Sequence, residues 1–229
     1  MSTQVREMFT AIAGRYDLAN EVLSMGMHRL WRRKAVQLSG VQQGQRVLDC
    51  ATGTGDLAMQ FKREVGSSGE VVGTDFCAAM LDQAPAKAQA AGLDIRFEIA
   101  DAQKLPYARS SFDVASIAFG VRNVEDPAKC MAEMARVVRP GGRVVVLEFG
   151  QPSGVFGALY RFYSRRVLPR VGGLLSGNRS AYEYLDRTAG AFPCGEAYLE
   201  IMRGTGAYRE CRATPLMFGA VYVYVGVVA

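Results

Sequence analysis

The sequence predicts a doubly wound α/β fold, in which a mainly parallel sheet carries helices on both faces. Three observations indicate this class. Short apolar segments alternate with amphipathic segments from residue 45 to residue 150, a glycine-containing turn (51–56) follows the first apolar segment, and a further apolar pair lies near 208–227. Strand–helix alternation of this kind is typical of parallel sheets with right-handed crossovers.

The segment before this alternation has a helical pattern. Its apolar residues recur every three or four positions, at Met8, Phe9, Ile12, Leu18, Val22 and Leu23. We therefore expect amphipathic helices within residues 1–44. We expect them to form a lid on a single domain that spans residues 1–229.

The alternating region contains five expected strands and three expected helices. The strands are short apolar runs at 46–51, 70–75, 95–101, 111–120 and 143–150. The helices are expected at 55–65, 78–92 and 127–139. Pro85 interrupts the second helix, whereas Pro127 begins the third and the run Pro140-Gly141-Gly142 ends it. A helical insert at 151–205 is expected before the last two strands.

Composition excludes several classes of protein. The chain has 229 residues, of which 49% are hydrophobic and 21% charged, as in globular domains and unlike disordered or fibrous chains. Five scattered cysteines and a single histidine argue against a disulfide framework and a metal centre, so no metal is expected. The first ten residues lack an apolar leader and no apolar span reaches about 20 residues, which predicts a cytoplasmic protein.

The turn after the first strand is the first candidate binding element. Gly53 and Gly55 allow a ligand to approach the backbone closely, and ligands of open α/β sheets bind beyond the carboxyl ends of the strands. Asp49 and Asp56 flank the turn. Their charge disfavours a pyrophosphate and favours a ligand with an ammonium or sulfonium group. The alternative is a turn that only joins a strand to a helix.

Acidic residues also follow the next two expected strands. Asp75 is suited to accept both hydroxyls of a ribose, or alternatively to cap the next helix. Asp101 is suited to accept the exocyclic amine of an adenine, for which the small Ala102 leaves room. Three acids after three successive strands indicate an adenosine with intact ribose hydroxyls and a cationic tail. The sequence therefore predicts S-adenosylmethionine as the cofactor.

Longer motifs resemble those of the ubiquinone/menaquinone biosynthesis C-methyltransferase family, within the class I S-adenosylmethionine-dependent methyltransferases. The resemblance runs nearly end to end, through RYDLAN, MGMHRLW, DCATGTGDLA, FGVRNVED, RPGG and LPRVG followed by AYEYL. It implies a seven-stranded Rossmann-like fold and cofactor binding by Thr54, Asp75, Asp101 and Ala102. It further implies C-methylation of a prenylated hydroquinone, most closely demethylmenaquinol to menaquinol.

The chain departs from this family's pattern at three places. Ala118 stands where Ser is frequent, Phe192-Pro193 where His-Pro is frequent, and LMFGAVYVYVG where the family has LTxGxVxxHxG. The departures bear on the choice between a menaquinone and a ubiquinone precursor, which the sequence leaves open.

Four residues are candidates for the chemistry at a substrate ring: Arg122, Asn123, Tyr16 and His28. Arg122 and Asn123 follow the fourth expected strand, where the crevice faces the cofactor. Arg122 is suited to stabilise a phenolate or to orient a water, unless it pairs with Glu125 or Asp126. Tyr16, on the expected lid, is suited to contact a ring hydroxyl or only to pack. His28 is the only histidine and titrates near neutral pH, although a capping or surface role is an equal alternative.

The insert at 151–205 is expected to face the substrate and the membrane. It contains five arginines and no Asp, Glu or Lys between residues 150 and 181, namely Arg161, Arg165, Arg166, Arg170 and Arg179. We expect peripheral contact with an anionic surface on the inner face of the cytoplasmic membrane, the alternative being a solvated helix face. Tyr182 and Tyr184 either wall the ring pocket or only pack. No nucleic-acid partner is expected, and the oligomeric state stays open.

Three other functions remain as alternatives. A methyltransferase of the same fold that acts on a nucleic acid or a protein differs in the acceptor that takes labelled methyl. An NAD-dependent dehydrogenase is opposed by Asp49 and Asp56, and differs in the cofactor that raises the melting temperature. A non-enzymatic chain that keeps the fold only for binding is opposed by the intact acids after the strands.

Overall fold

The computed structural model describes residues 3–176 and 179–229, apart from the side chains of residues 3, 4, 165, 168, 174–176, 179 and 182. The expectations for the side chains of Arg165, Arg179 and Tyr182 therefore lie outside the described residues.

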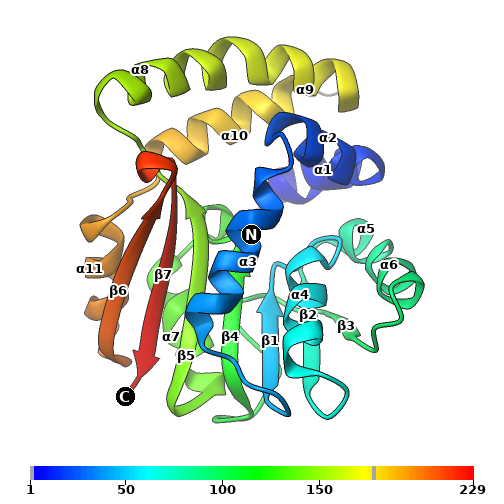
Figure 1. Ribbon diagram of the computed structural model, residues 1–229, viewed down its shortest axis with the longest axis vertical. Coiled ribbons are helices and arrows are strands. Elements are labelled where there is room, and N and C mark those ends of the chain that lie inside the picture. Colours follow the sequence, from blue (N-terminus) through cyan, green and yellow to red (C-terminus); the bar gives the residue numbers. More distant parts are fainter. Residues whose placement is uncertain (1–2, 177–178) are drawn as a thin grey trace.

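Seven strands form one sheet in the order β3-β2-β1-β4-β5-β7-β6 (Figure 1). Strands β1 to β5 pair in parallel, and β7 is antiparallel to both β5 and β6. The strands are β1 Arg46–Cys50, β2 Glu70–Asp75, β3 Arg96–Ile99, β4 Phe112–Ala118, β5 Val138–Phe149, β6 Tyr208–Leu216 and β7 Val221–Val228.

The central strands are buried on both faces, which is why their sequences are nearly continuous apolar runs. Val47 and Leu48 of β1 are fully buried, and Leu48 is paired with Val72 on one side and Ala115 on the other. One face of the sheet is covered by α3 Met27–Ser39 and α4 Asp56–Val65, and the other by α7 Pro127–Val137 and α11 Glu196–Gly204. Two short helices, α5 Ala78–Leu81 and α6 Ala84–Ala90, lie beside β2 and β3.

A second set of helices lies over the carboxyl ends of the parallel strands (Figure 1). The set comprises α1 Thr3–Ile12, α2 Tyr16–Leu23, α8 Gly154–Phe162, a π-helical turn Tyr163–Val167, α9 Leu168–Ser176 and α10 Arg179–Ala191. Within 3–176 and 179–229, none of the helices combines the length and the apolar character needed to cross a bilayer. The expected helices at the N-terminus and in the insert thus both form, and both cover the edge where a ligand would bind.

Two boundaries differ from the sequence prediction. The third expected helix ends at Val137, and β5 already begins at Val138, so that the Pro140-Gly141-Gly142 run belongs to the strand. Val138 is buried and pairs with Phe112 of β4, and this pairing favours an extended backbone over another helical turn. The helix expected at 78–92 is divided into α5 and α6, and Pro85 lies in the first turn of α6, where its missing N–H costs no hydrogen bond.

Candidate functional site

The turn between β1 and α4 has the backbone geometry expected of a ligand-binding loop. Gly53 has φ +58° and Gly55 has φ +86°, and a Cβ on Gly55 would lie 3.1 Å from the Phe97 ring. Ala51, at the end of β1, also has a positive φ of 49°, which is uncommon for a residue with a side chain. Such conformations cost energy and gather at functional sites.

Asp75 is fixed beside this turn by two backbone amides. Its Oδ2 accepts a hydrogen bond from Gly53 N at 2.9 Å, and its Oδ1 accepts one from Cys77 N at 2.8 Å. Burial raises the pKa of Asp75, while the backbone hydrogen bonds act in the opposite direction. Since each carboxylate oxygen can accept more than one hydrogen bond, the group is preorganised to accept two further donors side by side.

Asp101 and Ala102 lie at the next strand end, after β3. Asp101 Oδ1 accepts a hydrogen bond from Gln103 N at 2.9 Å, which leaves Oδ2 to accept another donor. Gln103 in turn accepts from Asp126 N through its Oε1 at 2.9 Å, so the loop after β3 is tied to the loop after β4. Ala102 is buried against the core. The turn with Asp49, Asp75, Asp101 and their neighbours is called the cofactor half of the site below.

Asp49 is a buried carboxylate that is hydrogen-bonded only by neutral groups. Its carboxylate oxygens accept hydrogen bonds from Thr52 Oγ1 and Ser116 Oγ, both at 2.7 Å. The residue is only 1% exposed. Burial raises the pKa of Asp49 to about 6. A positively charged ligand nearby would favour the ionised form of this carboxylate.

The expectation that Asp56 also serves to attract a cation is wrong for this structure. Asp56 Oδ1 accepts from Lys87 Nζ at 2.8 Å, and Arg32 Nη2 lies 3.8 Å from Oδ2. Burial opposes ionisation of Asp56, but Arg32 and Lys87 hold its pKa below the ordinary value. Its charge is therefore already balanced, because α3 and α6 bring two cations to the start of α4.

The hydroxyl of Thr54 faces α2. Thr54 Oγ1 donates to Asp17 Oδ1 at 2.6 Å, and Lys87 Nζ donates to both Thr54 Oγ1 and Asp17 Oδ2. A second contact, from Gln83 Nε2 to the Ala13 carbonyl at 2.7 Å, also ties this helical segment to α5–α6. The N-terminal helices are thus fastened over the glycine turn by polar contacts.

A cavity of about 110 Å³ lies between α2, α3, α8 and the ends of β4 and β5. A cavity needs about 10–15 Å³ to hold one water molecule, so this cavity has room for several. Tyr16, His28 and Arg122 all line it, so the structure brings three of the four expected residues to one place. The fourth, Asn123, accepts a hydrogen bond from Tyr184 OH at 3.2 Å, which connects the end of β4 to α10. This cavity and its walls are called the substrate half.

Arg122 forms an ion pair that the sequence did not indicate. Its partner is Glu148 of β5, with Nη1 2.7 Å from Oε1, and not Glu125 or Asp126. The two side chains are 4% and 1% exposed, Nη1 also donates to the Phe119 carbonyl, and the guanidinium lies over the Phe149 ring. Among the described residues, Arg122 Nε and Glu148 Oε2 are buried without a hydrogen-bond partner. A lone carboxylate in the apolar run VVVLEF was the signal that could have identified Glu148.

His28 is held on both sides of its ring. Nε2 lies 2.9 Å from Glu21 Oε2, and Nδ1 faces Arg32 Nη1. Because arginine can only donate, Nδ1 is the acceptor and the proton sits on Nε2. Burial lowers the pKa of His28 below the ordinary value, although Glu21 opposes this shift. His28 therefore lines the cavity as a neutral ring whose two nitrogens are both hydrogen-bonded. This favours a structural role over that of a base.

Aromatic side chains supply most of the remaining wall. Trp31 packs edge-on against Phe119 with ring centroids 6.2 Å apart, and Phe119 packs against Phe149 at 4.6 Å. Phe119 has φ +56°, a second positive angle at the end of a central strand. Burial raises the pKa of Tyr160 to about 12, so its phenol stays protonated at neutral pH. An apolar chamber with a buried guanidinium suits a flat ring that carries an oxygen.

The chain is similar to known proteins along nearly its whole length. A model of the ubiE/COQ5 methyltransferase family matches residues 1–228. The ubiquinone/menaquinone biosynthesis C-methyltransferase UbiE of Bdellovibrio bacteriovorus is 56% identical over 225 residues, which cover 98% of this chain and 95% of that protein. A demethylmenaquinone methyltransferase of Deinococcus radiodurans is 51% identical over 223 residues, which cover 97% and 91%.

Two solved structures show the same fold at low sequence identity. The magnesium protoporphyrin IX methyltransferase of Synechocystis, with bound SAH, has a TM-score of 0.69 and 17% identity, and the match covers 99% of both chains. A SAM-dependent methyltransferase of Aquifex aeolicus has a TM-score of 0.63 and 18% identity, with 86% of this chain and 89% of that chain covered.

The strand order, the glycine turn and these neighbours define the Rossmann-like fold of the S-adenosylmethionine-dependent methyltransferases, as the sequence predicted. Within that class, the end-to-end match and the high identities are more specific. The chain belongs to the ubiE/COQ5 methyltransferase family.

Proposed function

We propose that the chain methylates a ring carbon of a prenylated hydroquinone, most closely demethylmenaquinol to menaquinol, in menaquinone and ubiquinone biosynthesis. The observation that carries the proposal is the 56% and 51% identity, over nearly the whole chain, to relatives named for this activity. The apolar cavity with a buried guanidinium at its end supports a ring substrate that bears an oxygen.

The residues of the cofactor half fit S-adenosylmethionine. Asp75, with two oxygens fixed by backbone amides, is the acceptor for the ribose hydroxyls, and Asp101 with Ala102 is the site for the adenine. Gly53 and Gly55 let the cofactor approach the backbone, and Asp49 supplies the negative charge that its cationic tail requires. Bound there, the cofactor supplies an electrophilic methyl group.

The residues of the substrate half act on the ring. Arg122 donates a hydrogen bond to a ring oxygen and stabilises negative charge on it, which raises the electron density at the adjacent carbon. Glu148 holds Arg122 in place, Tyr16 borders the ring, and Asn123 connects the end of β4 to α10 through Tyr184. The carbon that gains the methyl group loses one proton in the same turnover, so the site must deliver one proton to water. The aromatic walls orient the ring, and alignment is the main requirement of an in-line transfer.

The helices over the strand ends have two roles in this proposal. Residues 1–44 form the lid that the Thr54–Asp17–Lys87 contacts close over the cofactor. The insert at 151–205 faces the substrate, and its arginines place the protein against an anionic membrane surface, on the inner face of the cytoplasmic membrane. Arg166 and Arg170 of this insert are exposed, which supports that placement.

Methyl transfer from labelled S-adenosylmethionine tests the proposal. Reduced demethylmenaquinone and the reduced benzoquinone precursor are offered side by side, with oxidised quinones as matched controls. We expect label in the reduced naphthoquinone and none in the oxidised form, because only the hydroquinone has an electron-rich ring. Label in both reduced rings would indicate dual specificity. Label in neither, with cofactor binding intact, would overturn the proposal in favour of a nucleic-acid or protein acceptor.

A further inference from the structure

The large apolar side chains that the structure leaves exposed are concentrated around the cavity. Nine such residues occur among the described residues, and eight of them lie on α2, the turn after it, α3, α8 and the loop between β6 and β7. These eight are Leu18, Val22, Met25, Leu30, Val155, Leu159, Phe162 and Phe218, and they are called the apolar rim below. The ninth, Ile99, lies on the edge strand β3.

The part of the rim on α8 is a regular stripe. Val155, Leu159 and Phe162 follow one another at four and three residues, so they project from one side of the helix. The opposite side packs inward at Gly157, where a Cβ would lie 2.0 Å from the Pro152 carbonyl. Val155 is 90% exposed, which leaves nearly its whole side chain in contact with water.

Phe218 is held outward by its backbone. It lies in a short 3-10 turn, Met217–Gly219, in which Met217 has φ +47° and Phe218 has φ +56°. Positive φ is unfavourable for bulky residues, yet the turn presents a phenylalanine that is 83% exposed. The ring centroid of Phe218 lies 5.1 Å from that of Phe156 on α8, so the turn and the helix form one continuous surface.

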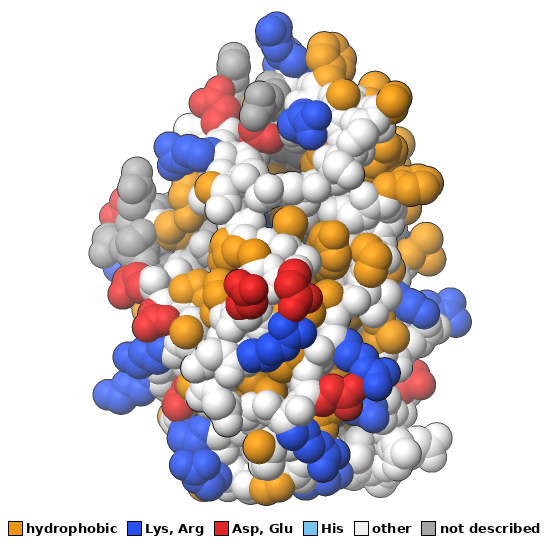
Figure 2. All heavy atoms as spheres, turned by 90° about the vertical axis from the view of Figure 1, so that its left-hand side faces the viewer, with side chains coloured by type: hydrophobic (Ala, Val, Ile, Leu, Met, Phe, Trp, Pro, Cys, Tyr) orange, Lys and Arg blue, Asp and Glu red, His pale blue; other side chains and the backbone are white. Residues whose placement is uncertain are grey.

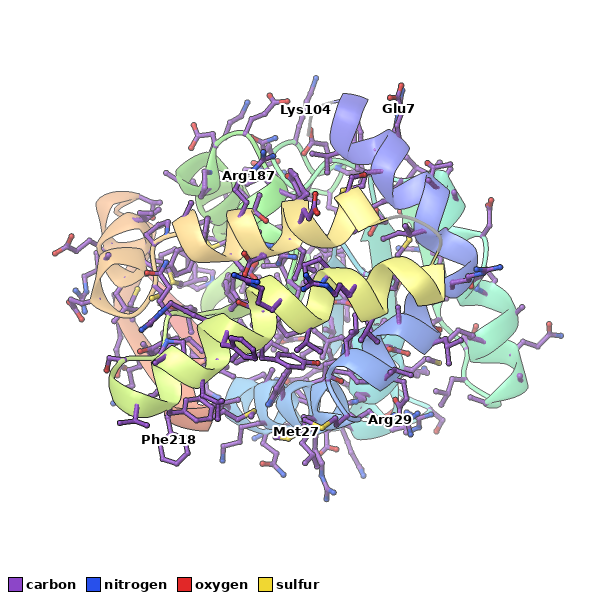
Figure 3. All side chains as sticks on the ribbon, turned by 90° about the horizontal axis from the view of Figure 1, so that it is seen from above. Glu7, Met27, Arg29, Lys104, Arg187 and Phe218 are labelled. Carbon is purple, nitrogen blue, oxygen red and sulfur yellow. The ribbon has the colours of Figure 1, made fainter. Side chains whose placement is uncertain are left out.

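The views of the molecule agree on where this surface lies. Seen from above, Phe218, Met27 and Arg29 stand on the same edge, whereas Glu7 and Lys104 stand on the opposite edge (Figure 3). On the flank shown in Figure 2, hydrophobic side chains gather along the upper right-hand edge, and charged side chains dominate the lower part. One edge of the helical cover is therefore rich in exposed hydrophobic side chains.

The same elements enclose the cavity. Leu23 and Ser24 at the end of α2, Trp31 of α3 and Tyr160 of α8 line it, and Tyr163 OH donates to the Leu23 carbonyl at 2.8 Å. Three of the elements that carry rim residues, α2, α3 and α8, thus also line the cavity. A hydrocarbon tail attached to a ring in this cavity would find apolar surface past Trp31 of α3 and Tyr160 of α8.

The charged residues near the apolar rim indicate which kind of partner it contacts. Residues 150–181 contain no Asp, Glu or Lys, and α3 adds the exposed Arg33 and Lys34. Arg29, also on α3, pairs with Glu21. Large exposed apolar patches mark interaction surfaces, and apolar residues with flanking cations match a bilayer that carries anionic headgroups.

Resting on the proposed function, we propose that the apolar rim inserts into the hydrocarbon layer of an anionic membrane, so that the prenyl tail passes between α3 and α8 without crossing water. The apolar side chains thus provide the anchor, whereas the arginines orient the protein. Binding to vesicles then has a component that high salt does not remove, because burial of apolar surface is not screened.

Vesicle flotation with equal parts of phosphatidylglycerol and phosphatidylcholine tests the inference. The triple variant Val155→Ser, Leu159→Ser and Phe218→Asn keeps the backbone preference at 218, because asparagine tolerates positive φ. We expect its partition into vesicles to fall by more than about tenfold, since three apolar side chains are lost from the interface. The control Ile99→Ser, which removes an exposed apolar side chain away from the rim, should bind as the wild type does.

Activity separates this inference from the proposed function. With a water-soluble short-tailed quinol, the triple variant should keep kcat/KM within about twofold of the wild type, whereas KM for a long-tailed quinol in vesicles should rise by more than about tenfold. If the wild type fails to methylate the short-tailed quinol, the proposed function fails. If it succeeds and the triple variant still floats with vesicles like the wild type, the inference about the rim is wrong.

A fluorescence measurement covers the case in which the triple variant is poorly folded. Phe218→Trp changes one exposed aromatic side chain, and the wild type, with Trp31 in the cavity wall, gives the baseline. Quenching of the added emission by lipids brominated on the acyl chain is expected. Emission at 218 that brominated lipids leave unchanged while the protein is vesicle-bound would overturn the proposed insertion.

Discussion

The two halves of the site are held in place by contacts of different range. In the cofactor half, Asp75 is fixed by amides two and twenty-two residues away, and Asp101 by the amide of Gln103. In the substrate half, Arg122 depends on Glu148, and Tyr163 reaches back across 140 residues to Leu23. The first half is built largely by the local backbone of strand ends, and the second by the pairing of β4 with β5 and by contacts between helical segments far apart in the sequence.

The two halves also differ in the buried charged groups that they contain. The cofactor half contains two buried carboxylates whose pKa burial raises, Asp49 and Asp75, and a cationic ligand would favour the ionised form of Asp49. The substrate half contains a buried ion pair with two unpartnered atoms, Arg122 Nε and Glu148 Oε2, for which removal of one partner leaves an uncompensated charge. The account therefore predicts that the halves fail separately, one in affinity and the other in turnover.

The largest expected effect is that of Arg122→Ala. Loss of the hydrogen bond to a ring oxygen should lower kcat by about 10²–10³-fold, in the range found for removal of a donor that stabilises developing negative charge. Because Arg122 lies in the substrate half, the dissociation constant for S-adenosylmethionine should change by less than about threefold. Steady-state kinetics and calorimetry measure the two quantities. Equal losses in kcat and in affinity for S-adenosylmethionine would show that the two halves do not fail separately. They would assign Arg122 a structural role.

Asp75→Asn should have the opposite profile. The amide cannot accept two ribose hydroxyls while also accepting from Gly53 and Cys77, so the cofactor should bind about 100-fold more weakly, the equivalent of two lost charge-assisted hydrogen bonds. Turnover at saturating cofactor should fall much less. Asp94→Asn, an exposed aspartate outside the site, is the matched control. An unchanged affinity by calorimetry would refute the ribose assignment.

Glu148→Gln sharpens the comparison within the substrate half. The variant keeps the shape of the side chain but removes the charge that holds Arg122, so we expect kcat to fall by about tenfold and the pH dependence of kcat to change. Glu133→Gln, which removes the carboxylate from the Glu133–Arg136 pair outside the cavity, is the control. A loss of stability without a change in the pH profile of kcat would reduce Glu148 to a structural role.

Asp49→Asn should change the stability of the ligand-free protein least at low pH, and the change should grow as the pH rises. Because the folded-state pKa of about 6 exceeds the ordinary 3.8, the protonated form favours folding, and this stability is lost as the pH rises from about 4 to about 6. The ligand-free variant should thus exceed the wild type in stability above pH 6, by on the order of 3 kcal/mol or less, with no difference near pH 4.

The same variant should lose a pH-dependent gain in cofactor affinity. A cationic ligand favours ionised Asp49, so wild-type affinity for S-adenosylmethionine should rise between about pH 5 and pH 7, while that of Asp49→Asn stays flat. Thermal denaturation and calorimetry across this range measure both effects. A wild-type affinity that does not vary with pH would remove Asp49 from the recognition of the cationic tail.

The residues of the cofactor half could be placed at the strand ends from the sequence because that information is local. An acid that ends a strand, or a glycine in the following turn, lies where the strand places it, so Gly53, Asp75 and Asp101 could be located from the order of strands alone. Asp56 was misjudged because its partners, Lys87 and Arg32, come from two other helices. Local patterns give the position of a charge but not the neighbours that balance it.

The substrate half was predicted only in part. Tyr16, His28 and Arg122 were indicated by the sequence as candidates for the chemistry at a substrate ring, and they line one cavity. The partner of Arg122 was not, because Glu148 lies on β5 and is brought beside Arg122 only when β4 and β5 pair. The apolar rim likewise depends on how α8 turns its stripe outward, which periodicity alone does not determine.

The most direct test of the account is a crystal structure with S-adenosylhomocysteine and a short-tailed reduced naphthoquinone. We predict the ring in the cavity lined by Trp31, Phe119 and Tyr160, with a ring oxygen about 3 Å from the Arg122 guanidinium, and the nucleoside on Asp75 and Asp101. A ring bound instead in the larger groove between α1 and α10, beside Met8 and Arg187, would contradict the account.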